Sequence, residues 1–174
     1  MKMLGLVGSP RKGGNTDMLV GRVLEGCSVN GHTTEKIYLY DYTIKPCLDC
    51  RACKTGGTCV LEDGMRGLYP RLQTADVIVF GTPLYWYGPA GQMKMLIDRM
   101  RPFIENGKLG GKKAVIVVPS EEGPSACRPL VQMLKKSFDY LGLGYGGGVL
   151  ATAYEKGEVS QEDLKKAYEL GESL

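Results

Sequence analysis

Short apolar runs alternate with segments of helical periodicity along the whole chain. The runs that predict β-strands cover residues 3–8, 34–40, 76–83, 113–120 and 146–153. Segments in which apolar residues recur every three or four positions predict helices at residues 15–27, 65–73, 90–100, 128–142 and 160–174. Asn15 or Thr16 offers a cap for the first helix, and Ser160 with Asp163 forms a capping box for the last. This alternation predicts an α/β fold.

Three of the five predicted strands are apolar at nearly every position, which is typical of a parallel sheet that helices cover on both faces. Ligands of such sheets bind at the carboxyl ends of the strands. A glycine-rich turn at residues 8–16 and an aromatic turn at residues 82–91 both lie at that edge. The long irregular segment 41–63 is a third candidate, because loops of this length in a compact domain are usually functional.

The composition narrows the classes of function. The chain of 174 residues suits a single domain, and a net charge of +3 with interspersed signs argues against nucleic acid as a partner. No apolar run approaches the roughly 20 residues that cross a bilayer, so no membrane association is expected. The apolar start is only as long as a strand, and glycines and charges follow it at once, unlike in a signal peptide. We therefore expect a cytoplasmic protein, in which disulfides are rare.

The first turn has the chemistry of a phosphate site. It reads "GSPRKGGNT" and offers the hydroxyls of Ser9 and Thr16, the Asn15 amide, the Arg11 cation and backbone N–H groups at a helix start. It lacks the Gly-Lys-Ser/Thr of a nucleoside-triphosphate loop and the Gly-x-Gly-x-x-Gly of a dinucleotide site. A terminal monophosphate fits these groups better. The alternative is a glycine-rich turn that only caps the helix.

The second turn, "TPLYWYGPAG", places three aromatic residues beside a proline after a buried strand. Pro83 and Leu84 can present backbone to a planar heterocycle, while Tyr85, Trp86 and Tyr87 can stack on it or flank it. The same aromatic residues would also suit a dimer interface, and the two uses are compatible.

Three stretches together resemble the flavodoxin-like NADPH-dependent FMN reductase superfamily and, within it, the iron–sulfur flavoprotein branch. They are "LGLVGSPRKGGNT", "KPCLDCRACKTGGTCVLED" and "GTPLYWYGPAGQMKMLIDR", and the similarity extends over about residues 1–140. The resemblance implies a flavodoxin-like three-layer sandwich with a five-stranded parallel sheet in the order 2-1-3-4-5. It also implies bound FMN and a homodimer or homotetramer with the flavin near a subunit interface. Residues 1–174 would then form a single FMN-binding domain with a cysteine-rich insertion at residues 41–63.

The resemblance also assigns the residues that would bind FMN. The phosphate would be held by Ser9, Arg11, Gly13, Asn15 and Thr16. The isoalloxazine ring would be lined by Pro83, Leu84, Tyr85 and Trp86, and the other side would be closed by the segment from Ser120 to Gly123. No side chain is assigned a catalytic role, because the cofactor carries the reaction.

Four of the six cysteines lie in one short segment, as Cys47, Cys50, Cys53 and Cys59. The expected compartment disfavours disulfides, and zinc usually takes two Cys-x-x-Cys pairs separated by a longer spacer. A compact run of this kind suits a [4Fe–4S] cluster. A cluster-free thiol loop is the alternative, since many flavin reductases of the superfamily have a similar loop. Cys27 and Cys127 are expected to be buried apolar residues.

These observations predict an FMN-containing redox protein that couples a flavin to a [4Fe–4S] cluster for electron transfer. Its partner would be a ferredoxin-like electron carrier or NAD(P)H. One alternative is a cluster-free NAD(P)H-dependent FMN or quinone reductase, and another is a non-catalytic redox sensor. Elsewhere, Lys94, Asp98 and Arg99 on one predicted helix suggest an ion pair or a subunit contact.

Overall fold

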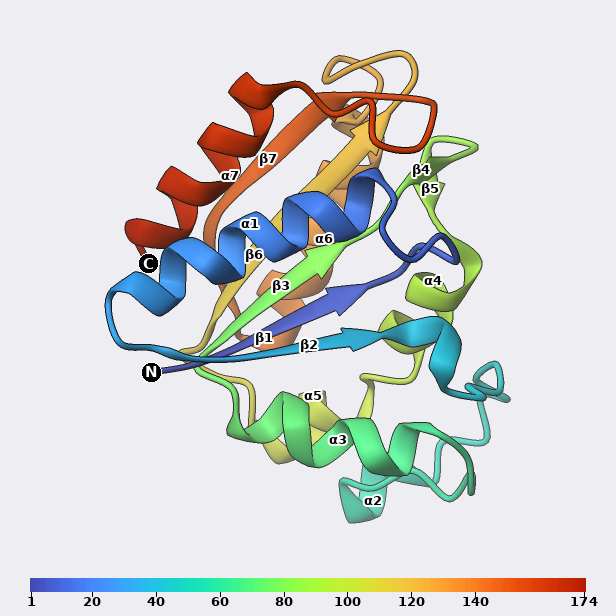
Figure 1. Cartoon of the computed structure of the whole chain (residues 1–174). Helices are drawn as coiled ribbons and strands as arrows, with labels where there is room; N and C mark the ends of the chain where they lie inside the picture. The colour runs from blue at the N-terminus through green and yellow to red at the C-terminus, as the bar shows by residue number, and fades with distance from the viewer.

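A twisted parallel sheet forms the middle layer of the molecule (Figure 1). The computed structural model describes residues 1–174. The strands of this sheet are β1 (Lys2–Val7), β2 (Thr33–Tyr38), β3 (Val77–Gly81), β6 (Lys113–Ser120) and β7 (Gly144–Thr152). They pair in the order β2-β1-β3-β6-β7, and every pairing is parallel. Numbered among themselves, these strands have the order 2-1-3-4-5, so the predicted topology is confirmed.

Burial explains why the central strands are almost wholly apolar. Every residue of β3 is buried, and in β6 only Lys113 is not. The edge strand β2 differs, since Ile37 is its only buried residue. Central strands of a parallel sheet face helices on both sides, so the apolar runs in the sequence mark the middle of the sheet.

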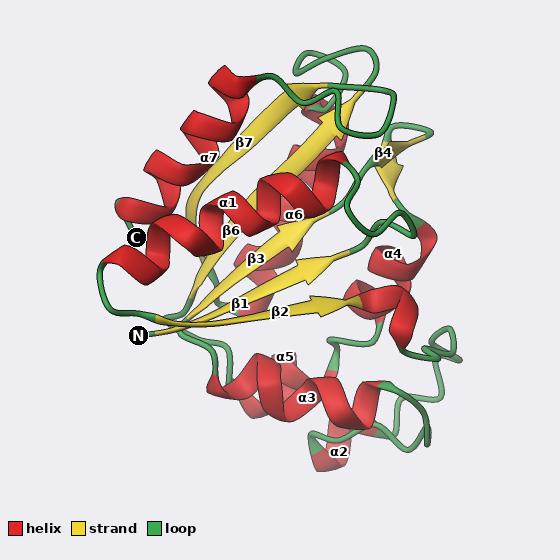
Figure 2. Cartoon of the chain, viewed as in Figure 1, coloured by secondary structure: helices red, strands yellow, loops and turns green.

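Helices cover both faces of the sheet (Figure 2). The longer helices are α1 (Asn15–Val29), α3 (Met65–Thr74), α4 (Gly91–Asp98), α6 (Arg128–Leu141) and α7 (Gln161–Glu172). One hydrophobic core joins α1 and α7 to the sheet through residues such as Val23 and Leu164. The other joins α3, α4 and α6 to the opposite face through Leu68, Leu96 and Phe138. The three-layer α/β architecture predicted from the sequence is therefore confirmed.

α1 and α7 approach each other backbone to backbone at two glycines. A Cβ on Gly26 would lie 2.1 Å from the carbonyl oxygen of Tyr168, and one on Gly171 would lie 2.1 Å from that of Val23. Only glycine permits such an approach. The two helices run side by side in the same direction, so the turns that precede them lie at the same end of the molecule (Figure 1).

Several short elements are absent from the prediction. Three are single helical turns, namely η1 (Leu39–Asp41), α2 (Cys53–Gly56) and α5 (Pro102–Asn106). The others are β4 (Leu84–Tyr85) and β5 (Gly88–Pro89), which pair as an antiparallel hairpin. Two-residue hairpin turns usually contain Asn-Gly or a similar pair, whereas this turn is Trp86-Tyr87, so the sequence carries no hairpin signal.

The helix caps are only partly as predicted. Ser160 Oγ accepts the Asp163 N–H at 3.1 Å, which confirms the cap of α7. The cap predicted for α1 is wrong, because the helix begins at Asn15 and its N-cap is Gly14, which has no side chain to accept a hydrogen bond. None of the helices combines the length and apolar character needed to cross a membrane.

Candidate functional site

A pocket of about 210 Å³ lies where the turns after β1, β3, β6 and β7 meet. Eight of the eleven residues predicted to bind FMN line it: Ser9, Arg11, Asn15, Thr16, Pro83, Leu84, Tyr85 and Ser120. Gly13, Trp86 and Gly123 do not line it. The remaining wall comes from Glu121, which lies within the predicted segment 120–123, and from residues that the sequence reasoning missed, which are Gly14, Pro119, Ala153, Tyr154 and Lys156.

The N-terminus of α1 faces this pocket with unused hydrogen-bond donors. Because the N-cap is a glycine, no side chain caps the helix, and the N–H groups of Asn15, Thr16 and Asp17 have no acceptor within the chain. Ser9 and Thr16 are buried polar residues in the pocket wall. Free N–H groups, two hydroxyls and the positive end of a helix dipole together form a site for an anion.

The turn at residues 8–16, the predicted phosphate turn, is held in shape by the carboxylate of Asp17. This carboxylate accepts the Gly13 N–H at 2.7 Å, a hydrogen bond from Lys36 Nζ at 2.7 Å and one from the Tyr38 hydroxyl at 3.0 Å. Burial raises the pKa of Asp17, but these hydrogen bonds outweigh it and hold the pKa below its ordinary value. Gly13 itself has φ +70°, a conformation that favours glycine. Gly13 therefore shapes the turn rather than lining the pocket.

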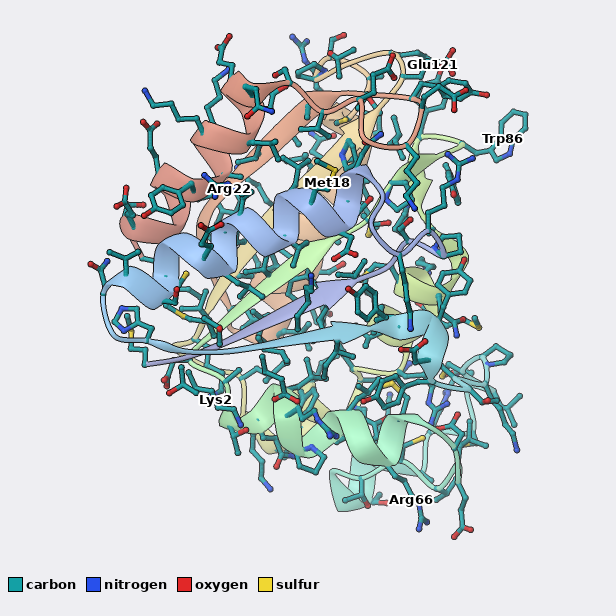
Figure 3. All side chains as sticks on the ribbon, in the orientation of Figure 1. Lys2, Met18, Arg22, Arg66, Trp86 and Glu121 are labelled. Atoms are coloured by element: carbon teal, nitrogen blue, oxygen red, sulfur yellow. The ribbon has the colours of Figure 1, made fainter.

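The aromatic turn forms the outer wall of the pocket. Thr82 Oγ1 accepts the Ala90 N–H at 2.9 Å and so ties the two ends of the β4–β5 hairpin together. Tyr85 lines the pocket, whereas Trp86 is 98% exposed and points away from the molecule (Figure 3). Trp86 and Tyr87 have φ of 50° and 60°, left-handed values that are strained for such residues.

The turn after β6 forms another wall of the pocket. Ser120 Oγ donates to the Gly123 carbonyl oxygen at 2.9 Å, so the serine orders its own turn. Gly123 has φ +78°, and a Cβ there would lie 2.7 Å from Thr152 Oγ1. The Tyr87 hydroxyl reaches the Glu122 carboxylate at 3.3 Å, which links this turn to the hairpin.

The cysteine loop, residues 45–63 of the predicted insertion, follows β2 and η1 at the same edge of the sheet. All four of its cysteines are free thiols, of which Cys47 and Cys50 are exposed, Cys53 is buried and Cys59 is half-buried. Cys59 faces inward, toward a cavity of about 440 Å³ between the loop, α3 and α5. No group of three or more potential ligands is close enough to hold a metal ion. The structure thus supplies four thiols in one loop but does not gather their sulfurs.

Burial and nearby ionisable groups shift the pKa of Cys53, the buried thiol of the loop. Burial raises the pKa of the Cys53 thiol, Arg101 opposes the rise, and the neighbouring Cys59 and Cys47 add to it. Asp49 binds Arg101 at 3.2 Å and connects the loop to α5. Asp49 and Arg51, on either side of Cys50, have left-handed φ of 46° and 61°.

The two ends of the cysteine loop are joined by a buried ion pair. Arg99 Nη1 donates to Asp63 Oδ2 at 2.6 Å and to the Lys45 carbonyl oxygen at 2.7 Å, and both charged side chains are 1% exposed. Asp63 also accepts the Lys45 N–H at 2.8 Å. Burial raises the pKa of Asp63, but Arg99 and the backbone donors lower it below its ordinary value.

Of the three charged residues noted on the predicted helix 90–100, two pair with each other and the third does not join them. Lys94 and Asp98 do pair, at 2.7 Å and near the surface. Arg99 instead turns inward to the loop. Cys27 and Cys127 are buried, as predicted.

The chain belongs to the NADPH-dependent FMN reductase family, whose model matches residues 1–156. An iron–sulfur flavoprotein of Archaeoglobus fulgidus is 32% identical over 178 residues, which cover 100% of this chain and 79% of the relative. An iron–sulfur flavoprotein of Methanocaldococcus jannaschii is 40% identical over 119 residues, or 66% of this chain and 62% of that protein. The resemblance stated from the sequence is therefore confirmed.

Solved structures confirm the flavodoxin-like fold. The Trp repressor binding protein from Bacillus subtilis aligns with a TM-score of 0.74 and 24% identity, covering 97% of this chain and 96% of its own. A flavodoxin, WrbA-like protein from Agrobacterium tumefaciens aligns with a TM-score of 0.66 and 22% identity, covering 99% and 93%. With the family match, the chain is an oxidoreductase of the FMN-dependent, NAD(P)H-linked type.

The residues present suit FMN better than they suit a [4Fe–4S] cluster, the two cofactors expected from the sequence. The pocket offers unpaired N–H groups, two hydroxyls and the cations Arg11 and Lys156, a donor set that suits the phosphate of FMN. The cysteine loop has the thiols that a [4Fe–4S] cluster requires but not their convergence.

Proposed function

We propose that this protein is an FMN-containing redox protein whose flavin exchanges electrons with a [4Fe–4S] cluster on Cys47, Cys50, Cys53 and Cys59. The observation that carries the flavin half is the pocket of unpaired donors at the start of α1. The four-thiol loop and the names of the relatives support the cluster half. When bound, FMN supplies both one-electron and two-electron transfer, which makes a link to a one-electron centre useful.

The cluster half of the proposal includes a rearrangement of the loop. Metal sites of this kind are rarely formed without their metal, and binding is coupled to local folding. The fixed ends of the loop at Lys45 and Asp63 would stay in place while the segment between them closes around the cluster. Free thiols such as these persist in a reducing compartment, so the proposal also includes a cytoplasmic location.

A cluster-free NAD(P)H-dependent FMN or quinone reductase is the second candidate. It is favoured by the dispersed thiols, and a Bacillus subtilis relative named a putative NAD(P)H-dependent FMN-containing oxidoreductase is 28% identical over 170 residues. In that case the pocket would serve FMN alone, and Cys47 to Cys59 would be a thiol loop. A redox sensor without turnover would share the pocket and differ in its kinetics.

Metal and flavin analysis of protein purified without oxygen separates these candidates. We expect one FMN and roughly four irons with matching sulfide per chain, as a four-thiolate cubane requires. One FMN without iron would refute the cluster half and leave the reductase. Protein that binds no FMN under any condition would refute the whole proposal.

Single substitutions locate the iron. Cys53→Ala should remove it without removing FMN, since the thiol would be a ligand of the cluster. Cys27→Ala is the matched control, because Cys27 is also a buried thiol but lies in α1. Iron that survives in Cys53→Ala, or that is lost equally in both variants, would contradict the assignment.

The electron donor can be identified by anaerobic mixing. NAD(P)H and a reduced ferredoxin-like carrier are the two donors proposed, and each is mixed with the oxidised protein while flavin absorbance is followed. Rapid bleaching by NAD(P)H in iron-free protein would favour the reductase, whereas bleaching only by the carrier and only in iron-loaded protein would favour electron transfer through a cluster. Slow reduction by both would favour the sensor.

We also propose that the functional unit is a homodimer or homotetramer. The pocket, at about 210 Å³, is smaller than the 300–1,000 Å³ typical of sites that enclose a ligand. Tyr85, Trp86 and Tyr87 beside it are 45%, 98% and 53% exposed. A second copy of the chain would bury these aromatics and complete the wall, and sedimentation of Trp86→Ala against the unmodified protein tests this.

A further inference from the structure

The turn between β7 and α7 brings a cation to the phosphate turn from about 140 residues away along the chain. This 154–158 turn reads "YEKGE", and both Tyr154 and Lys156 line the pocket. A Cβ placed on Gly13 would lie 3.6 Å from Lys156 Nζ, so the ammonium group lies directly beside the phosphate turn. Lys156 therefore faces the same space as the free N–H groups of α1.

Asn15 holds the 154–158 turn in place with both ends of its amide. Its Nδ2 donates to the Glu155 carbonyl oxygen at 2.8 Å, and its Oδ1 accepts the N–H groups of Gly157 and Glu158 at 2.9 and 3.0 Å. An Asn side chain has two N–H donors and one oxygen acceptor, so its oxygen is committed to the turn. Its oxygen and one of its two N–H donors are thus used in fixing the turn, and only the second N–H remains for a ligand.

The turn is also closed upon itself. Glu158 Oε2 accepts the N–H groups of Tyr154 and Glu155 at 2.7 and 2.8 Å. These bonds leave the carboxylate of Glu158 oriented toward its own backbone. Lys156, in contrast, has no salt-bridge partner in the chain, and the same is true of Arg11. Two unpaired cations in one pocket wall are available to an anion.

We propose that Lys156 binds the phosphate of FMN, and that Asn15 is a positioning residue that acts through Lys156 instead of binding the phosphate itself. This inference rests on the proposed FMN site and assigns a different role to Asn15 from the one the family resemblance implied. Arg11 would approach the phosphate from the turn after β1 and Lys156 from the turn after β7, with the helix N–H groups between them.

The test compares FMN with riboflavin, which lacks the phosphate. Apo-protein is titrated with each ligand and the quenching of flavin fluorescence gives the dissociation constants. Lys156→Gln should weaken FMN binding by about tenfold and leave riboflavin unchanged, since one charge-assisted contact to the phosphate is lost. Lys156→Arg should retain most of the affinity for FMN. Lys165→Gln is the matched control, because Lys165 is an exposed lysine in α7 that pairs with Glu169.

Asn15→Ala distinguishes the two roles of that residue. If Asn15 positions Lys156, the variant should show a loss specific to FMN, and the Asn15→Ala/Lys156→Gln double variant should bind FMN no more weakly than the weaker single variant. If Asn15 binds the phosphate directly, the two losses multiply. Riboflavin binding shows in each variant that the pocket is still folded.

Two results would overturn the inference. One is an unchanged ratio of FMN to riboflavin affinity in Lys156→Gln, and the other is multiplicative losses in the double variant. Failure of the unmodified protein to bind FMN is a separate outcome, because it would refute the proposed function itself.

Discussion

The phosphate pocket and the cysteine loop both follow the carboxyl end of a strand, but they are organised differently. The pocket is assembled from four turns, and its donors already converge because the sheet and the start of α1 place them. The cysteine loop is anchored at its base, where Arg99 binds Asp63 and the Lys45 carbonyl oxygen, and to α5 by two further contacts, but its thiols remain apart. A parallel sheet can thus preform a site from backbone groups, whereas a site made of side chains in one long loop depends on its ligand to complete it.

The largest expected effect comes from breaking the base of the cysteine loop. Arg99→Ala should lower the free energy of unfolding by about 3–5 kcal/mol, because it leaves the buried Asp63 carboxylate without its partner. Lys94→Ala on the same helix is the control, since its pair with Asp98 is exposed and should contribute under about 1 kcal/mol. Denaturant unfolding of both variants measures the difference. Equal effects would mean that the base of the loop is not rigid.

A smaller effect is expected at the phosphate pocket, where backbone shape is the critical feature. Gly123→Ala should destabilise the protein by about 2 kcal/mol, because alanine is strained at φ +78° and its Cβ would lie 2.7 Å from Thr152 Oγ1. Gly31→Ala shares the strain, at φ +74°, but meets no atom within 4 Å. The difference between their unfolding free energies isolates the close contact, and its absence would show that the turn after β6 yields easily.

Acid should lower the stability of the protein at both regions, because each contains one carboxylate with a lowered pKa. The pKa of Asp17 and that of Asp63 are lower in the folded protein than the ordinary value of about 3.9. Their contributions to stability are therefore complete above that value and are lost as the pH falls through the folded pKa values. Asp17→Asn should reduce the loss of unfolding free energy between pH 6 and pH 3, because it removes one of these two carboxylates. A wild-type slope in Asp17→Asn would refute this account.

The smallest effect is expected within the cysteine loop itself. Cys47→Ser and Cys50→Ser should change the stability of metal-free protein by no more than about 0.5 kcal/mol, because both side chains are exposed. The same variants should lose iron if the loop binds a cluster. Thermal unfolding of metal-free and iron-loaded protein, measured side by side, gives both results. A large loss of stability without iron would show that the thiols already pack as part of the fold.

Much of this organisation was accessible from the sequence. The apolar runs identified the strands because central strands of a parallel sheet are buried on both faces, and the residue types at 8–16 predicted an anion site where the structure has a pocket. Lys156 was missed because no motif marks the 154–158 turn and only the fold brings it to Asn15. The position of that turn after the last strand, at the same sheet edge, was the available signal.

Other features depend on distances that no local pattern encodes. Arg99 was grouped with Lys94 and Asp98 as a source of an ion pair or a subunit contact, but one residue of helical rotation directs it away from that pair to Asp63. Trp86 was expected beside the ring site, but the two-residue turn directs it outward. In both cases the residue type suggested an interaction, but the backbone conformation determines which way the side chain points.

The closed base of the cysteine loop makes this insertion an exchangeable cassette. Because Arg99 joins Lys45 to Asp63, a change in the length of the segment between them should add little to the cost of closing the loop, since the entropy of loop closure grows only slowly with length. A designer could graft a different redox loop between these two positions and keep the flavodoxin-like scaffold as it is.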